Sequence, residues 1–162
     1  MKKIITHSST ETKRYGERLI NFILEKGPIE HALILLLRGG LGSGKTTFLQ
    51  GVAKGLKIKE RITSPTFIIE RRFPLKNDKI RKRGFRNFYH IDCYRLKNKK
   101  DFQILGLNKI FSDPRNIIAI EWSQKIKEIL PQYSVFIDFK FLTPSQRQIK
   151  IKLTHKKWKN LF

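Results

Sequence analysis

In the first third of the chain, apolar residues first recur at helical spacing and then form an unbroken run. Ser8 to Glu11 has the Ser-x-x-Glu form of a capping box, and apolar residues then recur every three or four positions. This pattern predicts a helix over about Glu11 to Glu25, ended by Gly27 and Pro28. The following segment, Ala32 to Leu37, is apolar throughout, which is typical of a parallel strand covered on both faces. The pattern therefore favours an α/β fold.

Shorter apolar segments in the rest of the chain predict further strands and two helices. The expected strands are Phe67–Ile69, Phe88–Asp92, Ile117–Ile120, Val135–Phe139 and Gln148–Leu153, and the expected helices are Phe102–Phe111 and Gln124–Leu130. The first two strands flank the basic stretch Lys76 to Arg86, so we predict a hairpin with a long basic tip. The last two flank a polar turn at Pro144 and are expected to pair antiparallel.

A glycine-rich loop, Gly39 to Thr46, separates the apolar strand from an amphipathic segment, Thr47 to Lys54. We predict that this segment is a helix ended by Gly55. The loop has the spacing Gly-x-x-x-x-Gly-Lys-Thr, which between a strand and a helix is typical of a phosphate-binding loop. Glycines let backbone N–H groups point at phosphate oxygens, and the start of the helix adds positive charge. The sequence therefore predicts binding of a nucleoside triphosphate.

Each residue in the second half of this loop has an expected role. The expected contacts are backbone N–H groups of Gly42, Ser43 and Gly44 with phosphates, Lys45 with the β- and γ-phosphates, Thr46 with Mg²⁺ and Thr47 with the α-phosphate.

Hydrolysis of a bound triphosphate also needs an acidic group at the end of a neighbouring strand, which holds the metal or orients water. Asp92 and Glu121 each end a predicted strand. A single acid in such a place is often only a solvated cap. Two of them beside a phosphate-binding loop, in a chain with only 13 acidic residues, predict partners for metal and water.

The tetrapeptide Asn98-Lys99-Lys100-Asp101 has the Asn-Lys-x-Asp pattern with which GTPases select guanine. No apolar strand precedes it, and no Asp-x-x-Gly lies between it and the glycine-rich loop. We therefore reject a guanine site and predict that the nucleotide is ATP.

The composition predicts one compact domain over residues 1–162. A chain of this length with 40% hydrophobic residues can bury one sizeable core but not two. Its most apolar segment is too short to cross a membrane, and Met1 to Ile5 runs into polar residues rather than an export signal. The single cysteine, Cys93, fits a reducing compartment and is expected to be a small buried residue. We expect a cytoplasmic protein without a membrane span.

The net charge of +22 has two interpretations. Lys and Arg gain affinity for nucleic acid because they release the counterions of phosphates. A lysine-rich chain also arises by drift in an AT-biased genome, in which case the charges form a solvated surface. Of the two we favour drift.

Four motifs, in order along the chain, resemble one family: TsaE, the small bacterial ATPase of tRNA threonylcarbamoyladenosine biosynthesis. They are Gly-Gly-Leu-Gly-Ser-Gly-Lys-Thr-Thr-Phe from Gly39, Ser64-Pro65-Thr66-Phe67, His90-Ile91-Asp92-Cys93-Tyr94-Arg95-Leu96 and Ile120-Glu121-Trp122. The second and third motifs have no general role in P-loop proteins, so they make the resemblance specific. It covers nearly the whole chain.

The resemblance implies a P-loop NTPase-like fold of three layers, with a central, mostly parallel sheet and antiparallel edge strands. It implies a Mg²⁺-dependent ATPase, weak alone, that acts on partner proteins which install the threonylcarbamoyl group next to the anticodon of tRNA. The family member is not itself the transferase. By position, Glu121 would hold Mg²⁺ with Thr46, and Asp92 would position water or the metal shell. Ser64 and Thr66 would form a switch that senses the γ-phosphate.

Three further nucleotide contacts follow from the resemblance. Trp122 would lie near the nucleotide, and otherwise is a core aromatic. Ser9 and Arg147 would also contact the nucleotide. The alternative for Ser9 is that it caps a helix, and the alternative for Arg147 is that it lies in an exposed turn. The chain departs from the family at Gly40, where an acid is usual, and at Ser123, where proline is usual. The first departure puts an acid-dependent role of the loop in question.

Two other functions are alternatives. A small-molecule kinase shares the P-loop but needs an arginine-rich lid, and Lys76 to Arg86 lies early in the chain for one. A nucleic-acid-binding module with a weak ATP site would use its basic charge directly. In the TsaE interpretation, tRNA contact is indirect or runs through Lys76 to Arg86, unless this stretch is a solvated hairpin tip.

Overall fold

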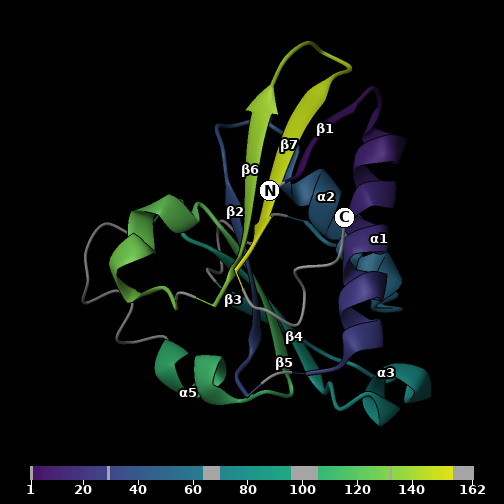
Figure 1. Ribbon diagram of the computed structural model, residues 1–162, viewed down its shortest axis with the longest axis vertical. Coiled ribbons are helices and arrows are strands. Elements are labelled where there is room, and N and C mark those ends of the chain that lie inside the picture. Colours follow the sequence, from purple (N-terminus) through teal and green to yellow (C-terminus); the bar gives the residue numbers. More distant parts are fainter. Residues whose placement is uncertain (1, 29, 64–69, 96–105, 132, 155–162) are drawn as a thin grey trace.

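The computed structural model describes residues 2–28, 30–63, 70–95, 106–131 and 133–154. Seven strands form one sheet in the order β1-β7-β6-β2-β5-β4-β3 (Figure 1). The strands are β1 (Lys2–Thr6), β2 (Leu33–Arg38), β3 (Glu70–Pro74), β4 (Asn87–Asp92), β5 (Asn116–Glu121), β6 (Val135–Phe141) and β7 (Arg147–Leu153). The helices are α1 (Ser9–Lys26), α2 (Lys45–Gly55), α3 (Asp78–Lys82), α5 (Leu107–Ser112) and the 3₁₀ helix η1 (Ser123–Ile129).

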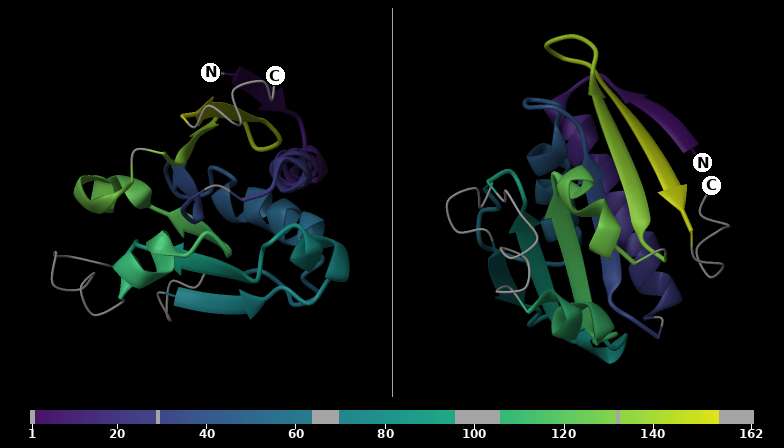
Figure 2. Two further views of the ribbon diagram at one scale, coloured as in Figure 1. Left: turned by 60° about the horizontal axis from the view of Figure 1, so that its bottom comes forward. Right: turned by 90° about the vertical axis from the view of Figure 1, so that its left-hand side faces the viewer.

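The expected α/β fold, with a parallel sheet centre and antiparallel edge strands, is confirmed. Strands β6, β2, β5 and β4 are parallel neighbours, while β7 and β1 on one side and β3 on the other are antiparallel. Helices α1 and α2 cover one face and α5 and η1 the other, which gives three layers (Figure 2). The apolar strands β2 and β5 lie at the centre because both of their faces are buried.

Helices α1 and α2 pack unusually closely, and this fixes where α2 begins. A Cβ added to Gly51 would lie 1.8 Å from the Lys13 carbonyl oxygen, and one added to Gly16 would lie 2.2 Å from the Phe48 carbonyl oxygen. Only glycine permits such an approach of two backbones. Since α2 starts directly at the glycine-rich loop, this contact also positions the loop.

Several element predictions need correction. Strand β1 was not predicted, because Lys2 to Thr6 has too few apolar residues to stand out and owes its strand form to pairing with β7. The predicted helix at Gln124–Leu130 is instead a 3₁₀ helix with a kink at Ile126. The predicted end of α2 at Gly55 is confirmed, since Gly55 is its last residue. Hydrogen bonds from Lys57 N to Lys54 O and from Ile58 N to Ala53 O close this end of the helix.

The basic stretch Lys76 to Arg86 is more than a loop at a hairpin tip. A hairpin is present as predicted, but its first strand as described is β3 (Glu70–Pro74), which follows the predicted Phe67–Ile69, and Phe73 lies opposite Phe88 of β4. Within the tip, Asn77 caps α3, and Ile80 and Phe85 are buried in the core. The tip is therefore anchored, while most of its cationic side chains remain exposed.

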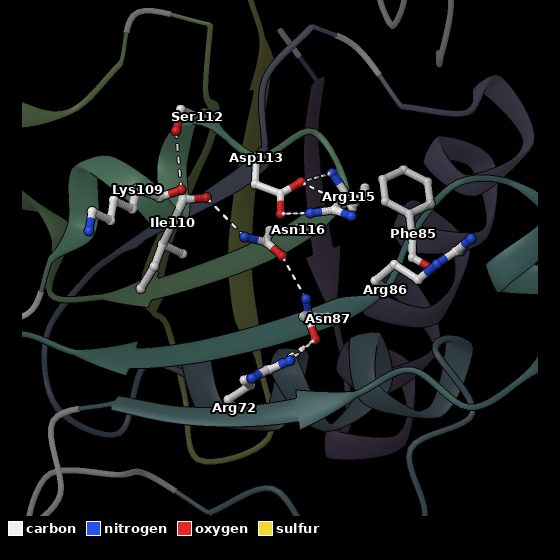
Figure 3. A network of polar contacts seen from close by, with 10 residues as sticks. All are labelled: Arg72, Phe85, Arg86, Asn87, Lys109, Ile110, Ser112, Asp113, Arg115 and Asn116. Atoms are coloured by element: carbon white, nitrogen blue, oxygen red, sulfur yellow. Dashed lines mark hydrogen bonds and ion pairs between the residues drawn. The ribbon is translucent and has the colours of Figure 1, made fainter.

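Figure 3 shows the end of the sheet that lies away from the glycine-rich loop. The Asn87 side chain donates to Asn116 Oδ1 at 2.9 Å, and Asn116 donates to the Ile110 carbonyl oxygen at 3.1 Å. Arg72 donates to Asn87 Oδ1 from the edge strand β3. These bonds tie three strands and α5 together, so polar side chains here serve the fold.

Two expectations about burial and membranes can be compared with the structure. Cys93 is fully buried as predicted, and burial raises the pKa of its thiol to about 12. No helix in the described ranges is long and apolar enough to cross a membrane. The predicted strand Phe67–Ile69, the tetrapeptide Asn98 to Asp101 and the first residues of the predicted helix Phe102–Phe111 lie outside the described residues.

Candidate nucleotide-binding site

The candidate site lies where the parallel strands β2, β5 and β4 reach their carboxyl ends. In the sheet register, Glu121 is opposite Leu37 on one side and Asp92 on the other. The glycine-rich loop follows β2 at this same edge. Ligands of open α/β sheets bind at the carboxyl ends of the strands, so the fold brings the loop and both predicted acids together.

Left-handed and extended glycines shape the loop. Gly39, Gly42 and Gly44 have φ values of 148°, 66° and 99°. A Cβ on Gly39 would lie 2.6 Å from the Phe139 carbonyl oxygen, so the loop passes too close to β6 for a side chain. Gly44 is the N-cap of α2 and supplies no side-chain cap. The first N–H groups of α2 thus face the loop, ready for an anion.

Lys45 folds back on the loop that carries it. Its Nζ donates to the carbonyl oxygens of Gly39 at 3.0 Å and Gly40 at 2.8 Å. The side chain is only 5% exposed, and burial lowers the pKa of its ammonium group. The carboxylates of Glu121 and Asp92 act in the opposite direction on this pKa. Phosphate oxygens would be stronger hydrogen-bond partners for this ammonium group than the carbonyl oxygens, because they are charged.

Thr46 and Glu121 form the hydrogen-bonded centre of the site. The Thr46 hydroxyl donates to Glu121 Oε1 at 3.0 Å and lies 3.2 Å from Oε2. Glu121 is 2% exposed and also forms a 3.0 Å hydrogen bond with His90 Nε2. Since a carboxylate only accepts, this bond requires the Nε2–H form of His90. The carboxylate is thereby held from two sides.

Asp92 is the second buried acid at this edge. Its Oδ1 accepts a 2.9 Å hydrogen bond from the Tyr94 backbone N–H, and the side chain is nearly inaccessible. In the register it stands beside Glu121 on the neighbouring strand. The predicted pair of strand-end acids is therefore adjacent in space.

The donors at this edge fit Mg²⁺ that is bound together with phosphates. Among the described residues, no three His, Cys, Asp or Glu side chains converge as a metal site. A hydroxyl and one carboxylate suit Mg²⁺, which usually keeps several waters and takes phosphate oxygens as ligands. The buried Ser43 Oγ in the loop lacks a protein hydrogen-bond partner, as expected where a phosphate supplies one.

Two pockets are lined by residues of the loop. The larger has a volume of about 530 Å³ and is lined by His7, Ser8, Ser9, Thr12, residues 42–47, Pro144, Ser145 and Arg147. The smaller, about 270 Å³, is lined by Leu41, Gly42, Lys45, Thr46, Tyr94, Glu121 and Trp122. The first has room for much of a nucleotide. The second surrounds Lys45 and the Thr46–Glu121 pair.

Ser9 and Arg147 both line the larger pocket. The cap of α1 is Ser8, whose side chain accepts from the Glu11 N–H, so the alternative in which Ser9 caps the helix is wrong. Arg147 is the first residue of β7, and its Nε donates to the Gly42 carbonyl oxygen at 3.1 Å. It is therefore not in an exposed turn but against the loop.

Trp122 packs against the core and also lies beside Lys45. It packs against the smaller core cluster, and its ring lies 4.3 Å from the Lys45 ammonium. Its φ of 58° is left-handed, an uncommon conformation for a residue with a large side chain. Tyr94 lies beside it, with ring centroids 5.0 Å apart.

Gly40 and the predicted switch, Ser64 and Thr66, remain to be placed. Gly40 is exposed, an added Cβ there would meet no atom within 4 Å, and its carbonyl oxygen binds Lys45. The backbone role of this position thus needs no acid. Ser64 and Thr66, the predicted switch, lie outside the described residues.

His90 is the site residue for which no role was predicted. A signal was present, because residues alternate sides along a strand and His90 therefore shares a face with Asp92. Its diagonal relation to Glu121 became visible only when the register placed β4 beside β5.

Comparison with known proteins agrees with this geometry. Residues 6–151 match the family model of the threonylcarbamoyl adenosine biosynthesis protein TsaE. The tRNA threonylcarbamoyladenosine biosynthesis protein TsaE of Treponema pallidum is 32% identical, over 92% of this chain and 98% of that protein. The protein of the same name from Bacillus subtilis is 37% identical, over 72% and 66%. The crystal structure of Bacillus subtilis YdiB matches with a TM-score of 0.74 and 28% identity, over 99% and 90%.

Proposed function

The chain belongs to the TsaE family of threonylcarbamoyl adenosine biosynthesis proteins, and on this basis we propose that it is the ATP-hydrolysing component of that machinery. It acts on the partner proteins that form threonylcarbamoyladenosine next to the anticodon of tRNA and does not transfer the group itself. The observation that carries this proposal is the hydrogen-bonded pair Thr46–Glu121, held beside the buried ammonium of Lys45.

The residues present define a division of roles in this proposal. Lys45 binds the β- and γ-phosphates, Thr47 binds the α-phosphate, and the N–H groups at the start of α2 surround them. Thr46 and Glu121 hold Mg²⁺, which when bound neutralises charge that develops on the phosphates. Asp92 orients water or the metal's water shell. Ser9, Arg147 and Trp122 contact the nucleotide from the two pockets, and Ser64 and Thr66 sense its γ-phosphate.

His90 is a positioning residue in this proposal. Its bond to Glu121 Oε1 holds the carboxylate toward Thr46, as partners of metal-binding side chains commonly do. The backbone of Glu121 is also fixed, because Cys93 N donates to its carbonyl oxygen at 3.0 Å. The acid is therefore fixed before any metal arrives.

Exposed apolar side chains support a partner that closes the site. Leu41 is 78% exposed and Tyr94 is 45% exposed, and both line the smaller pocket around Lys45. Water therefore has access to the γ-phosphate end in the isolated chain, which agrees with weak activity alone. A partner that covers this rim would exclude water and complete the site.

The proposal is tested by ATP turnover with and without the partner proteins and tRNA. We expect the partners to raise turnover, and Glu121→Ala to weaken Mg²⁺-dependent binding or turnover roughly 10–100-fold while the chain stays folded. His90→Leu should raise the Mg²⁺ concentration needed for half-maximal turnover, and His90→Gln should restore part of it. Unchanged turnover in Glu121→Ala contradicts the metal assignment. ATP consumption in proportion to phosphorylation of a metabolite would replace this proposal with a kinase.

A further inference from the structure

The carboxyl end of α2 places a lysine where helices usually place glycine. Lys57 has a φ of 57°, in the left-handed region. The hydrogen bonds from Lys57 N to Lys54 O and from Ile58 N to Ala53 O form a Schellman motif. Glycine is favoured at this position because it has no Cβ. A lysine that keeps this conformation suggests a use for its side chain.

Lys57 lines a pocket that no role in nucleotide hydrolysis explains. The pocket has a volume of about 580 Å³ and is lined by Lys13, Gln50, Ala53, Lys54, Lys57, Ile58, Lys59, Glu60, Arg61 and Ile62. Five of these residues are cationic and one is acidic. Of these five cations, Lys54 forms an ion pair within the described residues, with Glu17 at 3.0 Å. The floor is apolar, formed by Ala53, Ile58 and the buried Ile62.

The helix dipole does not account for this cluster of charge. Lysines in the last turn of a helix are stabilised by its negative end, which explains Lys54. The effect falls off within that turn, whereas Lys59 and Arg61 lie beyond it and are exposed. Gln50 holds the segment that carries them, since its side chain donates to the Ile62 carbonyl oxygen at 3.1 Å. The cations are thus gathered on an anchored segment.

We propose that this pocket binds the phosphate backbone of RNA. Lysine ammonium groups are point charges that suit phosphates, and the apolar floor offers a surface for a base. The net charge of +22 would speed the encounter with a polyanion. The choice of RNA over an acidic protein segment rests on the proposed place of the chain in tRNA modification. The site itself is separate from the ATP site, which lies at the opposite end of α2.

A matched pair of triple variants tests the location. One variant replaces Lys57, Lys59 and Arg61 by Gln, and the other replaces Lys79, Arg81 and Lys82 of α3 by Gln, which removes the same charge. Binding of a tRNA transcript is measured by fluorescence anisotropy over a range of salt concentrations. We expect the pocket variant to lose roughly tenfold or more in affinity and to lower the salt slope by about 2. The α3 variant should stay within about twofold.

Each other outcome overturns the proposal in a defined way. Equal losses in both triple variants mean that RNA senses only the overall charge. A larger loss in the α3 variant means that the stretch Lys76 to Arg86 is the RNA surface. Stronger competition by polyglutamate than by RNA of equal charge means that the pocket takes an acidic protein segment.

Lys57→Gly separates binding from folding. Glycine suits the left-handed position, so the melting temperature should stay the same or rise while RNA affinity falls. A fall in both would mean that Lys57 serves the fold and would remove the argument for its side chain. ATP turnover of the pocket variants without RNA should equal that of the natural chain, so that failure here and failure of the ATPase proposal can be told apart.

Discussion

The two ends of helix α2 both place a residue in the left-handed region, but they use different residues to do so. At the amino end Gly44 has a φ of 99°, and at the carboxyl end Lys57 has a φ of 57°. At the amino end no side chain caps the helix, and a Cβ on Gly44 would lie 3.4 Å from Arg147 Cγ. At the carboxyl end the side chain lines the pocket. The proposed nucleotide site at the amino end thus relies on backbone groups, whereas the proposed RNA site at the carboxyl end relies on side chains.

Replacement of Lys45 should give the largest effect, because it removes the buried side-chain cation of the amino end. Loss of its charge-assisted bonds to phosphate should weaken binding of Mg²⁺-ATP by roughly 100-fold in Lys45→Ala, about 2.7 kcal/mol. Stability without nucleotide should not fall, because burial already disfavours the charged form of Lys45. Isothermal titration calorimetry and urea unfolding measure the two quantities. An affinity within about threefold of the natural chain would contradict the assignment of Lys45.

Gly51→Ala tests the contact with α1 that holds both ends in place. The added Cβ would lie 1.8 Å from the Lys13 carbonyl oxygen, so the helices must separate. We expect the free energy of unfolding to fall by about 1–3 kcal/mol, as measured by urea denaturation. Gly40→Ala is the control, since its Cβ meets nothing within 4 Å and stability should stay within about 0.5 kcal/mol. Equal effects of the two substitutions would show that the close approach is not needed.

Nucleotide binding at the amino end should change the protonation of Lys45. Burial lowers its pKa below the ordinary 10.5 in the free protein, and bound phosphates should raise it again. Between these two pKa values, nucleotide binding takes up a proton, so affinity falls as pH rises through that interval. Calorimetry in two buffers of different ionisation enthalpy detects the uptake, and Lys45→Ala should abolish it. Identical heats in both buffers would exclude the effect.

The smallest effect is expected at the carboxyl end. Lys57→Gly should leave the free energy of unfolding unchanged or raise it by up to about 1 kcal/mol, because glycine avoids the left-handed strain. Lys54→Gly makes the same substitution inside the helix and should lower it by about 1 kcal/mol. Thermal unfolding of the two variants compares them directly. A loss of stability in both would mean that Lys57 is held by contacts other than its backbone position.

The elements predicted best are those whose signals are local. The capping box at Ser8 predicted the start of α1 to within a few residues, because the cap is made by neighbours in the sequence. The apolar runs of β2 and β5 predicted the sheet centre, since burial on both faces requires apolar residues at every position. The loop between β2 and α2 was recognised from its glycine spacing between an apolar run and an amphipathic segment. For these elements no knowledge of distant contacts was needed.

The elements that were missed depend on contacts between distant residues. Strand β1 exists because β7 pairs with it, and two of its own five residues are lysines. Gly55 is the last residue of α2 as predicted, but it also serves a helix contact that was not predicted, since a Cβ there would lie 2.4 Å from Ile20 Cγ2. A glycine in a sequence does not reveal whether it supplies a turn or a close approach.

The sequence by itself determined the groups of the candidate site: the glycine spacing of a phosphate-binding loop, a lysine and a hydroxyl at its end, and acids at two strand ends. Composition and spacing suffice for this because each group belongs to a short segment. The tertiary structure decided which groups meet. Sheet register brought His90 to Glu121, and the end of β7 brought Arg147 to the loop. Folding also gathered the cations beyond α2 around one pocket. Such meetings depend on packing between segments far apart in the chain, which no local pattern encodes.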